Sequence, residues 1–179
     1  MRLFTALLLN EEIKDYMTEA GQELRTRSVK GNFTRRDNLH LTLVFLGEVS
    51  EDKLGAVKSA IDRVHGEPFR LVLSGFGKFR KNGGDIHWAG VGKSEALLAI
   101  RKQLAAELEK AGVSLEDREY SPHLTLGRQV RLADPDEMIY GSLGPVKPEM
   151  EVSRISLMKS ERIDGKLVYT EIYERDLVM

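Results

Sequence analysis

The sequence contains no cysteine, only four histidines among 179 residues, and a formal net charge of only −1. The lack of cysteine excludes disulfide bonds and thiolate metal ligands, and it favours a reducing cytoplasm as the location of the protein. A net charge near zero gives no overall attraction to nucleic acid, so contact with a polyanion requires a local basic patch.

Long apolar runs are also absent. The run at the N-terminus covers about seven residues before Asn10 and Glu11. It lacks a small-residue cleavage site, so we interpret it as a buried first strand and not as a signal peptide. A membrane-spanning helix needs roughly 18 apolar residues, and no later run reaches that length. We therefore expect no membrane partner.

One tetrapeptide, His-Leu-Thr-Leu, occurs twice, at residues 40–43 and 123–126. Both copies alternate polar and apolar residues with the period of two that is typical of a half-buried strand. Since successive side chains of a strand point to opposite faces, each His shares a face with its Thr, opposite the two leucines. A duplication that merely kept a good strand pattern is the alternative, but such a pattern does not require histidine in both copies.

Periodicity and turn residues predict the remaining elements. Helices are predicted over residues 10–24, 50–66 and 94–112, with Asn10, Ser50 and Ser94 as N-caps. The Gly31-Asn32 pair predicts a break, and Pro135, Gly144, Pro145 and Pro148 predict a long loop that serves as a lid or is simply mobile. Strands are predicted over residues 3–9, 38–47, 69–79, 85–91, 120–129, 152–159 and 166–175.

In each half of this order, a helix precedes a motif strand and a hairpin follows it. We therefore expect an α+β, bilobed fold with approximate two-fold symmetry, in which two mostly antiparallel sheets line a central cleft and helices pack outside. No linker rich in Gly, Ser or Pro separates the halves. Residues 1–179 are thus expected to form a single domain.

Two histidines that face one cleft suit either a metal ion or an acid–base pair. A metal site needs further carboxylate, His or Cys ligands, and neither motif carries a carboxylate on its histidine face. An acid–base pair fits better: histidine titrates near pH ~6.5, so one imidazole can accept a proton while the other donates one. Thr42 and Thr125 can donate hydrogen bonds to the oxygens of a phosphorus centre as negative charge develops there. The pattern favours substitution at phosphorus.

The segments NLHLTLVFLG (38–47) and SPHLTLGR (121–128) resemble the paired HXTX motifs of the two-histidine phosphoesterase superfamily. The most similar branch is that of the RNA 2′,3′-cyclic phosphodiesterases, also called 2′-5′ RNA ligases. The resemblance covers nearly the whole chain and includes Phe4 in the first strand, Trp88, and Pro122 before the second motif. It implies hydrolysis of 2′,3′-cyclic phosphate ends of RNA to 2′-phosphate, without metal or cofactor, with reverse ligation as a related activity.

The resemblance also implies roles for individual residues. His40 is the expected proton donor to the departing 3′ oxygen, and His123 is the expected proton acceptor that activates water. Thr42, Thr125 and Arg128 are expected to bind the substrate phosphate. The two imidazoles have the same neighbours in sequence, so the residues alone leave the direction of proton transfer open.

Arg128 raises a geometric question, because strict alternation places it on the leucine face, opposite His123. Either Gly127 allows a β-bulge that turns Arg128 toward the site, or Arg128 is a surface charge. Trp88 and Tyr120 either stack on a nucleobase or pack within the protein.

Two other sets of residues have less specific readings. Arg35 and Arg36 either guide an RNA tail or form a solvated turn. The segment 92–94, Gly-Lys-Ser, imitates a phosphate-binding loop, but position 87 holds His where that motif requires its first glycine.

Two alternative functions remain open from the sequence. The same cleft can act on small cyclic nucleotides or on the cyclic phosphate of ADP-ribose, or the chain can be a non-catalytic nucleotide-binding module. The expected partner is therefore RNA with cyclic phosphate ends or a small nucleotide, bound by a monomer.

Overall fold

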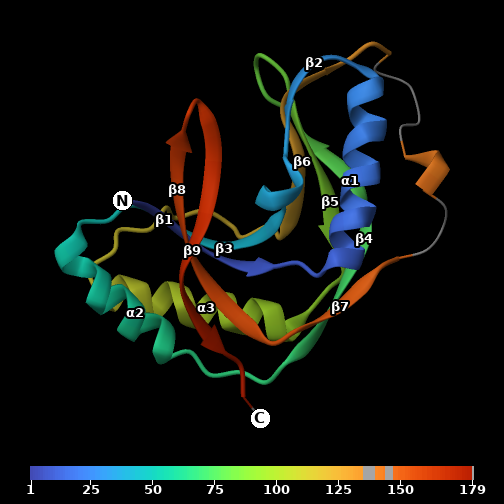
Figure 1. The fold of residues 1–179 in the computed structure, drawn as a ribbon. Helices are drawn as coiled ribbons and strands as arrows, with labels where there is room; N and C mark the ends of the chain where they lie inside the picture. Colours follow the sequence, from blue (N-terminus) through green and yellow to red (C-terminus); the bar gives the residue numbers. More distant parts are fainter. Residues whose placement is uncertain (135–139, 144–146, 179) are drawn as a thin grey trace.

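Figure 1 shows the computed structural model, which describes residues 1–134, 140–143 and 147–178. The described residues form three α-helices, which are α1 (Glu11–Thr26), α2 (Leu54–Asp62) and α3 (Glu95–Lys110). Three short 3-10 helices are η1 (Arg36–Asn38), η2 (Glu51–Lys53) and η3 (Gly141–Leu143). The strands are β1 (Arg2–Leu8), β2 (Ser28–Phe33), β3 (His40–Glu48), β4 (Phe69–Phe79), β5 (Asp85–Val91), β6 (His123–Leu132), β7 (Glu149–Val152), β8 (Arg154–Ile163) and β9 (Lys166–Asp176).

The strands form two sheets in which every pair is antiparallel. One sheet has the order β3-β1-β8-β9 and the other has the order β2-β6-β5-β4-β7. Helix α1 packs on β2 and β6, whereas α2 and α3 lie along the other sheet, where they contact β9 and β3 (Figure 1). The two motif strands, β3 and β6, contact each other where the sheets meet. The predicted α+β class, with two antiparallel sheets and helices outside, is confirmed.

The predicted caps of α1 and α3 are also confirmed. The Asn10 side chain accepts a hydrogen bond of 2.9 Å from the Ile13 N–H, and the Ser94 hydroxyl accepts one of 3.2 Å from the Leu97 N–H. These contacts satisfy amide groups that have no partner within the helix. Both helices bury apolar residues spaced by three or four, namely Ile13, Met17, Ala20 and Leu24 in α1 and Leu97, Ile100, Leu104 and Leu108 in α3.

The structure corrects the prediction for residues 50–66. The Ser50 hydroxyl does not cap a helix, because the chain first makes the 3-10 turn η2, and α2 begins only at Leu54. The helix ends at Asp62, before Gly66. His65 therefore lies beyond the helix, where Gln103 binds both its N–H and its carbonyl group.

The predicted break at Gly31-Asn32 is wrong. Both residues belong to β2, which pairs with β6, and the Asn32 side chain donates a hydrogen bond of 2.8 Å to Gln129. This long-range pairing overrides the weak strand propensity of glycine and asparagine. Residues 149–152 form a separate strand, β7, which pairs with the start of β4. Of the predicted loop, Pro135, Gly144 and Pro145 lie outside the described residues.

The core explains the alternation of the two motifs. The motif leucines Leu41, Leu43, Leu124 and Leu126 are at most 1% exposed and belong to one continuous apolar cluster fed by both sheets. A smaller cluster of Phe4, Ala6 and Met158 forms separately from it. No helix within the described ranges is long and apolar enough to cross a membrane.

Candidate active site

Each motif strand carries a β-bulge just after its His-x-Thr pair. On β3, Ala6 of β1 opposes Thr42 and Thr5 opposes Val44, so Leu43 is the extra residue. On β6, Trp88 of β5 opposes Thr125 and His87 opposes Gly127, so Leu126 is the extra residue. An extra residue reverses the alternation of faces beyond it.

The bulges determine which side chain comes next on the histidine side of each strand. After the bulge the first exposed residue is Phe45 on β3 and Arg128 on β6. Gly127 is buried, and a Cβ there would approach Val130 Cγ2 to 3.0 Å. The bulge that the sequence suggested at Gly127 is present with Leu126 as its extra residue, and Arg128 does not follow the strict alternation that places it on the leucine face.

His40 is held at both ring nitrogens. Its Nδ1 lies 2.7 Å from the carbonyl oxygen of Asn38, and its Nε2 lies 2.8 Å from Thr42 Oγ1. A carbonyl oxygen only accepts, so Nδ1 carries the hydrogen, and in the neutral ring Nε2 accepts from the Thr42 hydroxyl. The ring packs on Phe4 at 4.9 Å and meets Tyr169 edge-on at 5.2 Å, between ring centroids.

His123 repeats part of this arrangement. Its Nδ1 lies 2.7 Å from the carbonyl oxygen of Ser121, two residues earlier, as in His40. Its ring meets Phe79 edge-on at 5.0 Å and lies 6.3 Å from the Trp88 ring. Within the described part of the chain, no hydrogen bond joins His123 to Thr125.

The two histidines share one electrostatic environment. Burial is the largest cause of the lowered pKa of His40, and the charges of Arg128 and His123 lower this pKa further. Burial is also the largest cause of the lowered pKa of His123, and the charges of Arg128 and Arg118 lower this pKa further. Coulomb effects of this kind need nearby charges, so the same guanidinium acts on both rings. Both shifts therefore favour the neutral form of each imidazole in the free protein.

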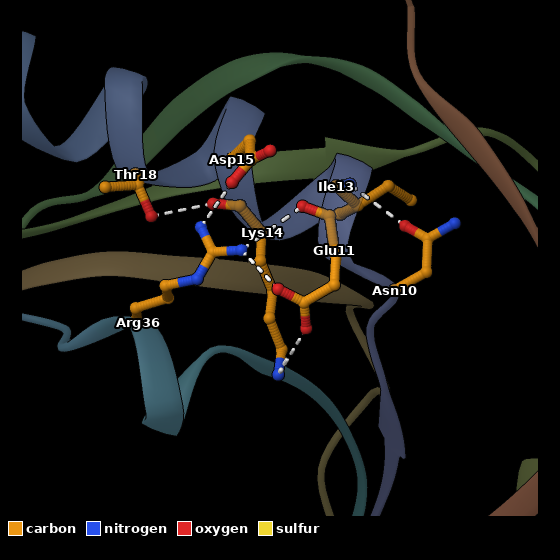
Figure 2. Close-up of polar contacts among 7 residues, drawn as sticks. All are labelled: Asn10, Glu11, Ile13, Lys14, Asp15, Thr18 and Arg36. Carbon is orange, nitrogen blue, oxygen red and sulfur yellow. Dashed lines mark hydrogen bonds and ion pairs between the residues drawn. The ribbon is translucent and has the colours of Figure 1, made fainter.

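The segment before His40 is fixed by contacts to distant elements. Arg36 forms ion pairs of 2.6 Å with Glu11 and with Asp15 on α1, as Figure 2 shows. Arg35 and Asn38 both donate to the carbonyl oxygen of Leu167 on β9, each at 2.9 Å. Both arginines are thus engaged by the protein itself and position the strand that carries His40.

Asn38 was missed by the sequence reasoning as a site residue. It is 7% exposed, its side chain binds β9, and its carbonyl group orients His40. The only sequence signal is a polar residue two positions before the motif histidine, which Ser121 repeats before His123.

Trp88 and Tyr120 also make contacts within the protein. A Cβ at Gly77, opposite Trp88, would lie 2.4 Å from the indole, so the ring covers this glycine closely beside His123. Tyr120 donates a hydrogen bond of 2.8 Å to the carbonyl oxygen of Thr42, and Arg101 lies 5.1 Å from its ring centroid. Tyr120 therefore ties the segment before β6 to β3 at the junction of the sheets.

Among the described residues, no three His, Cys, Asp or Glu side chains gather as ligands for a metal ion. A hollow of about 150 Å³ lies between α1 and β2, lined by Met17, Gly21, Phe33 and the buried Leu126, and neither motif histidine lines it.

Known proteins resemble this chain in sequence and in structure. The sequence profile of the 2′-5′ RNA ligase superfamily matches residues 14–164. An RNA 2′,3′-cyclic phosphodiesterase of Thermotoga maritima is 33% identical, over 97% of this chain and 94% of the relative. Another, from Methanocaldococcus jannaschii, is 31% identical over 97% of this chain and 99% of the relative.

Solved structures show the same fold over nearly the whole length. The crystal structure of Escherichia coli LigT complexed with 3′-AMP has a TM-score of 0.81 and 26% identity, covering 99% of this chain and 98% of that one. TT0787 of Thermus thermophilus has a TM-score of 0.80 and 30% identity, with the same coverage. The profile match and the full-length relatives together show that this chain belongs to the 2′-5′ RNA ligase superfamily.

Proposed function

We propose that this protein hydrolyses 2′,3′-cyclic phosphate ends of RNA to 2′-phosphate, using His40 and His123 as an acid–base pair. The observation that carries the proposal is the matched mounting of the two imidazoles. Each ring binds a backbone carbonyl through Nδ1 and so presents Nε2, and both rings sense the charge of Arg128. The relatives named RNA 2′,3′-cyclic phosphodiesterases support the same assignment.

In the proposed reaction, His123 Nε2 accepts a proton from water as the water oxygen bonds to phosphorus. The bond between phosphorus and the 3′ oxygen breaks, and protonated His40 donates its Nε2 proton to that oxygen. The phosphate remains on the 2′ oxygen. Thr42, Thr125 and Arg128 stabilise the negative charge on the non-bridging oxygens. Each proton transfer contributes on the order of 10² to 10⁴ in rate.

The electrostatics of the site predict an acid-shifted pH dependence. The donor must be protonated, and burial lowers the pKa of His40 in the free protein from its ordinary value. Since kcat/KM reports the free enzyme, it falls as pH rises through that lowered pKa. A bound phosphate anion favours the charged imidazole and raises its pKa, so the alkaline limb of kcat lies at higher pH than that of kcat/KM. Measured pH profiles with coinciding limbs would contradict this coupling.

The test is turnover of an oligoribonucleotide with a 2′,3′-cyclic end, with the product isomer identified by ³¹P NMR. Activity is expected to persist in EDTA and to fall at least about a hundredfold in His40→Ala and in His123→Ala. His65→Ala is the matched control, because His65 is exposed beyond α2. Full activity in both motif variants would reject the proposal.

A small-nucleotide substrate is the second candidate, favoured by the Escherichia coli relative whose structure contains 3′-AMP. A tenfold higher kcat/KM for an oligonucleotide than for a nucleoside cyclic phosphate favours RNA, and the reverse order favours the nucleotide.

The proposal extends to the domain organisation, the oligomeric state and the location of the protein. We infer that residues 1–179 form a single bilobed domain, supported by the apolar cluster that both sheets share. We also infer that it acts as a monomer in the cytoplasm. Sedimentation and cell fractionation test these two points.

A further inference from the structure

Tyr169 lies beside His40 although it belongs to the opposite edge of the same sheet. In the strand order β3-β1-β8-β9, two strands separate Tyr169 on β9 from His40 on β3. The Tyr169 ring nevertheless meets the His40 ring edge-on at 5.2 Å and the Phe4 ring at 5.0 Å, between centroids. The sheet therefore curves over Phe4 and brings a tyrosine of its last strand to the first motif histidine.

The strand that carries Tyr169 is tied to the segment before His40. The Asn38 side chain donates a hydrogen bond of 2.9 Å to the carbonyl oxygen of Leu167, and the carbonyl group of Asn38 binds His40 Nδ1. Leu167 lies two residues before Tyr169 on β9. One residue, Asn38, thus fixes both the imidazole and the strand of the phenol.

The contacts of Tyr169 use its ring and leave its hydroxyl without a partner. Tyr173, on the same strand, donates a hydrogen bond of 2.6 Å to Asp62, but no group in the described ranges binds the Tyr169 hydroxyl. Burial raises the pKa of the Tyr169 phenol, so the hydroxyl stays protonated near neutral pH and is available as a donor. Packing against Phe4 and His40 needs only the ring, so packing does not account for the hydroxyl.

Tyr169 shares the electrostatic environment of the two histidines. Against the rise that burial causes, the charge of Arg128 lowers the pKa of Tyr169, as it lowers those of His40 and His123. A charge shifts a pKa in this way only from nearby, so the three groups lie around one guanidinium. An anion between the two histidines is therefore close to Arg128 on one sheet and to Tyr169 on the other.

The donors of the two motif strands differ in what they are free to bind. On β6, neither Thr125 nor Arg128 forms a side-chain hydrogen bond within the described structure. On β3, the Thr42 hydroxyl is bonded to His40 Nε2 at 2.8 Å. The Tyr169 hydroxyl supplies the first sheet with a donor that is not engaged in this way.

We propose that Tyr169 is a catalytic residue whose hydroxyl donates a hydrogen bond to a non-bridging oxygen of the cyclic phosphate, from the side opposite Arg128. This inference rests on the proposed function and adds a ligand of the phosphate to it. The phenol keeps its proton throughout. As water bonds to phosphorus, negative charge develops on the non-bridging oxygens and the hydrogen bond becomes stronger. Its loss should therefore lower kcat.

The first test removes the hydroxyl and keeps the ring. Tyr169→Phe is expected to lower kcat for a nucleoside 2′,3′-cyclic phosphate by about tenfold to a hundredfold, the range of one hydrogen bond to a charged group, with unchanged thermal unfolding. Tyr173→Phe is the matched control, because it removes a hydroxyl of the same strand that binds Asp62, and it should leave kcat unchanged. Full kcat in Tyr169→Phe would overturn the inference.

Phosphorothioate substrates test whether the hydroxyl touches the phosphate. A 2′,3′-cyclic phosphorothioate exists as two diastereomers, in each of which sulfur, a weak hydrogen-bond acceptor, replaces one of the two non-bridging oxygens. For one diastereomer, Tyr169→Phe should lower the rate less than it does for the cyclic phosphate, because sulfur has already weakened that hydrogen bond. Equal losses for the cyclic phosphate and both diastereomers would show that Tyr169 does not contact a non-bridging oxygen.

Failure of the proposed function can be told apart from failure of this inference. If wild-type protein hydrolyses cyclic phosphates and Tyr169→Phe retains full kcat, only the inference fails. If wild-type protein hydrolyses none, the function fails, and binding of inorganic phosphate, followed by ³¹P NMR, decides the inference. Binding weakened about tenfold in Tyr169→Phe but not in Tyr173→Phe would support it. Equal binding by the three proteins, or no binding by any, would overturn it.

Discussion

Strands β3 and β6 begin with the same four residues, but the contacts of their histidines differ. Both orient the ring through a carbonyl group two residues upstream, and both bulge after the threonine. Only His40 is also hydrogen-bonded to its own threonine, while His123 has no such bond in the described structure. The strands then diverge to Phe45 and Arg128. The shared features orient the two rings in the same way, and the unshared features give the two histidines different neighbours.

The largest expected effect concerns the leucines that the two strands share. Leu41 and Leu124 are both 0% exposed, so replacement of either by alanine should lower the free energy of unfolding by about 2–5 kcal/mol. If the halves form one domain, both variants shift the same single transition in urea, followed by circular dichroism. A second transition in only one variant would show that the halves unfold separately.

Removal of the Arg128 charge should affect both strands at once. Arg128→Met is expected to lower kcat/KM about a hundredfold, as loss of one donor to developing oxyanion charge does. Because the Arg128 charge lowers the pKa of His40 and of His123, both values should rise in this variant, measured by NMR titration. Arg131→Met, an exposed change on the same strand, is the control. An equal effect of the two substitutions would assign Arg128 to the surface.

Replacement of the two motif threonines by valine is expected to have different effects on the two strands. Thr42→Val removes the hydroxyl that binds His40 Nε2, and a hydrogen bond from a charged ring is stronger than one to a neutral ring. The pKa of His40 should therefore fall further, with a loss of about tenfold in kcat/KM. Thr125→Val should leave the pKa of His123 in place and raise KM instead. Identical NMR titrations for the two variants would remove the distinction between the strands.

The smallest effect is expected at the helix caps. Asn10→Ala and Ser94→Ala should each lower the free energy of unfolding by about 1 kcal/mol, because each leaves an amide without its partner. Ser50→Ala is the contrasting variant, since its hydroxyl caps no helix, and it should cost less than either. Thermal unfolding of the three variants ranks them, and a larger loss at Ser50 would contradict the structure.

Features set by neighbouring residues could be predicted from the sequence. The hairpin of β4 and β5 has the predicted bounds, because Asn82-Gly83-Gly84 marks its turn and alternation marks its strands. The histidine and leucine faces of both motifs follow from the same alternation. The hypothesis that the two motifs act together followed from their repetition alone.

Features set by distant residues could not be predicted. Strand β2 exists because β6 pairs with it, and the sequence of Gly31 and Asn32 alone favours a turn. The position of Arg36 depends on two carboxylates of α1. The residues next to Arg36 in the sequence do not indicate that its charge is paired. The exposure of Phe45 depends on the bulge at Leu43, which only the register with β1 reveals.

The carbonyl contact of each motif histidine lies within three consecutive residues, of which only the histidine belongs to the strand. The orientation of each imidazole is thereby set by a contact within its own three-residue fragment. The fragment recurs although β3 is the edge strand of its sheet and β6 is paired on both sides. The same local contact therefore orients both motif histidines, although the remaining neighbours of the two rings differ.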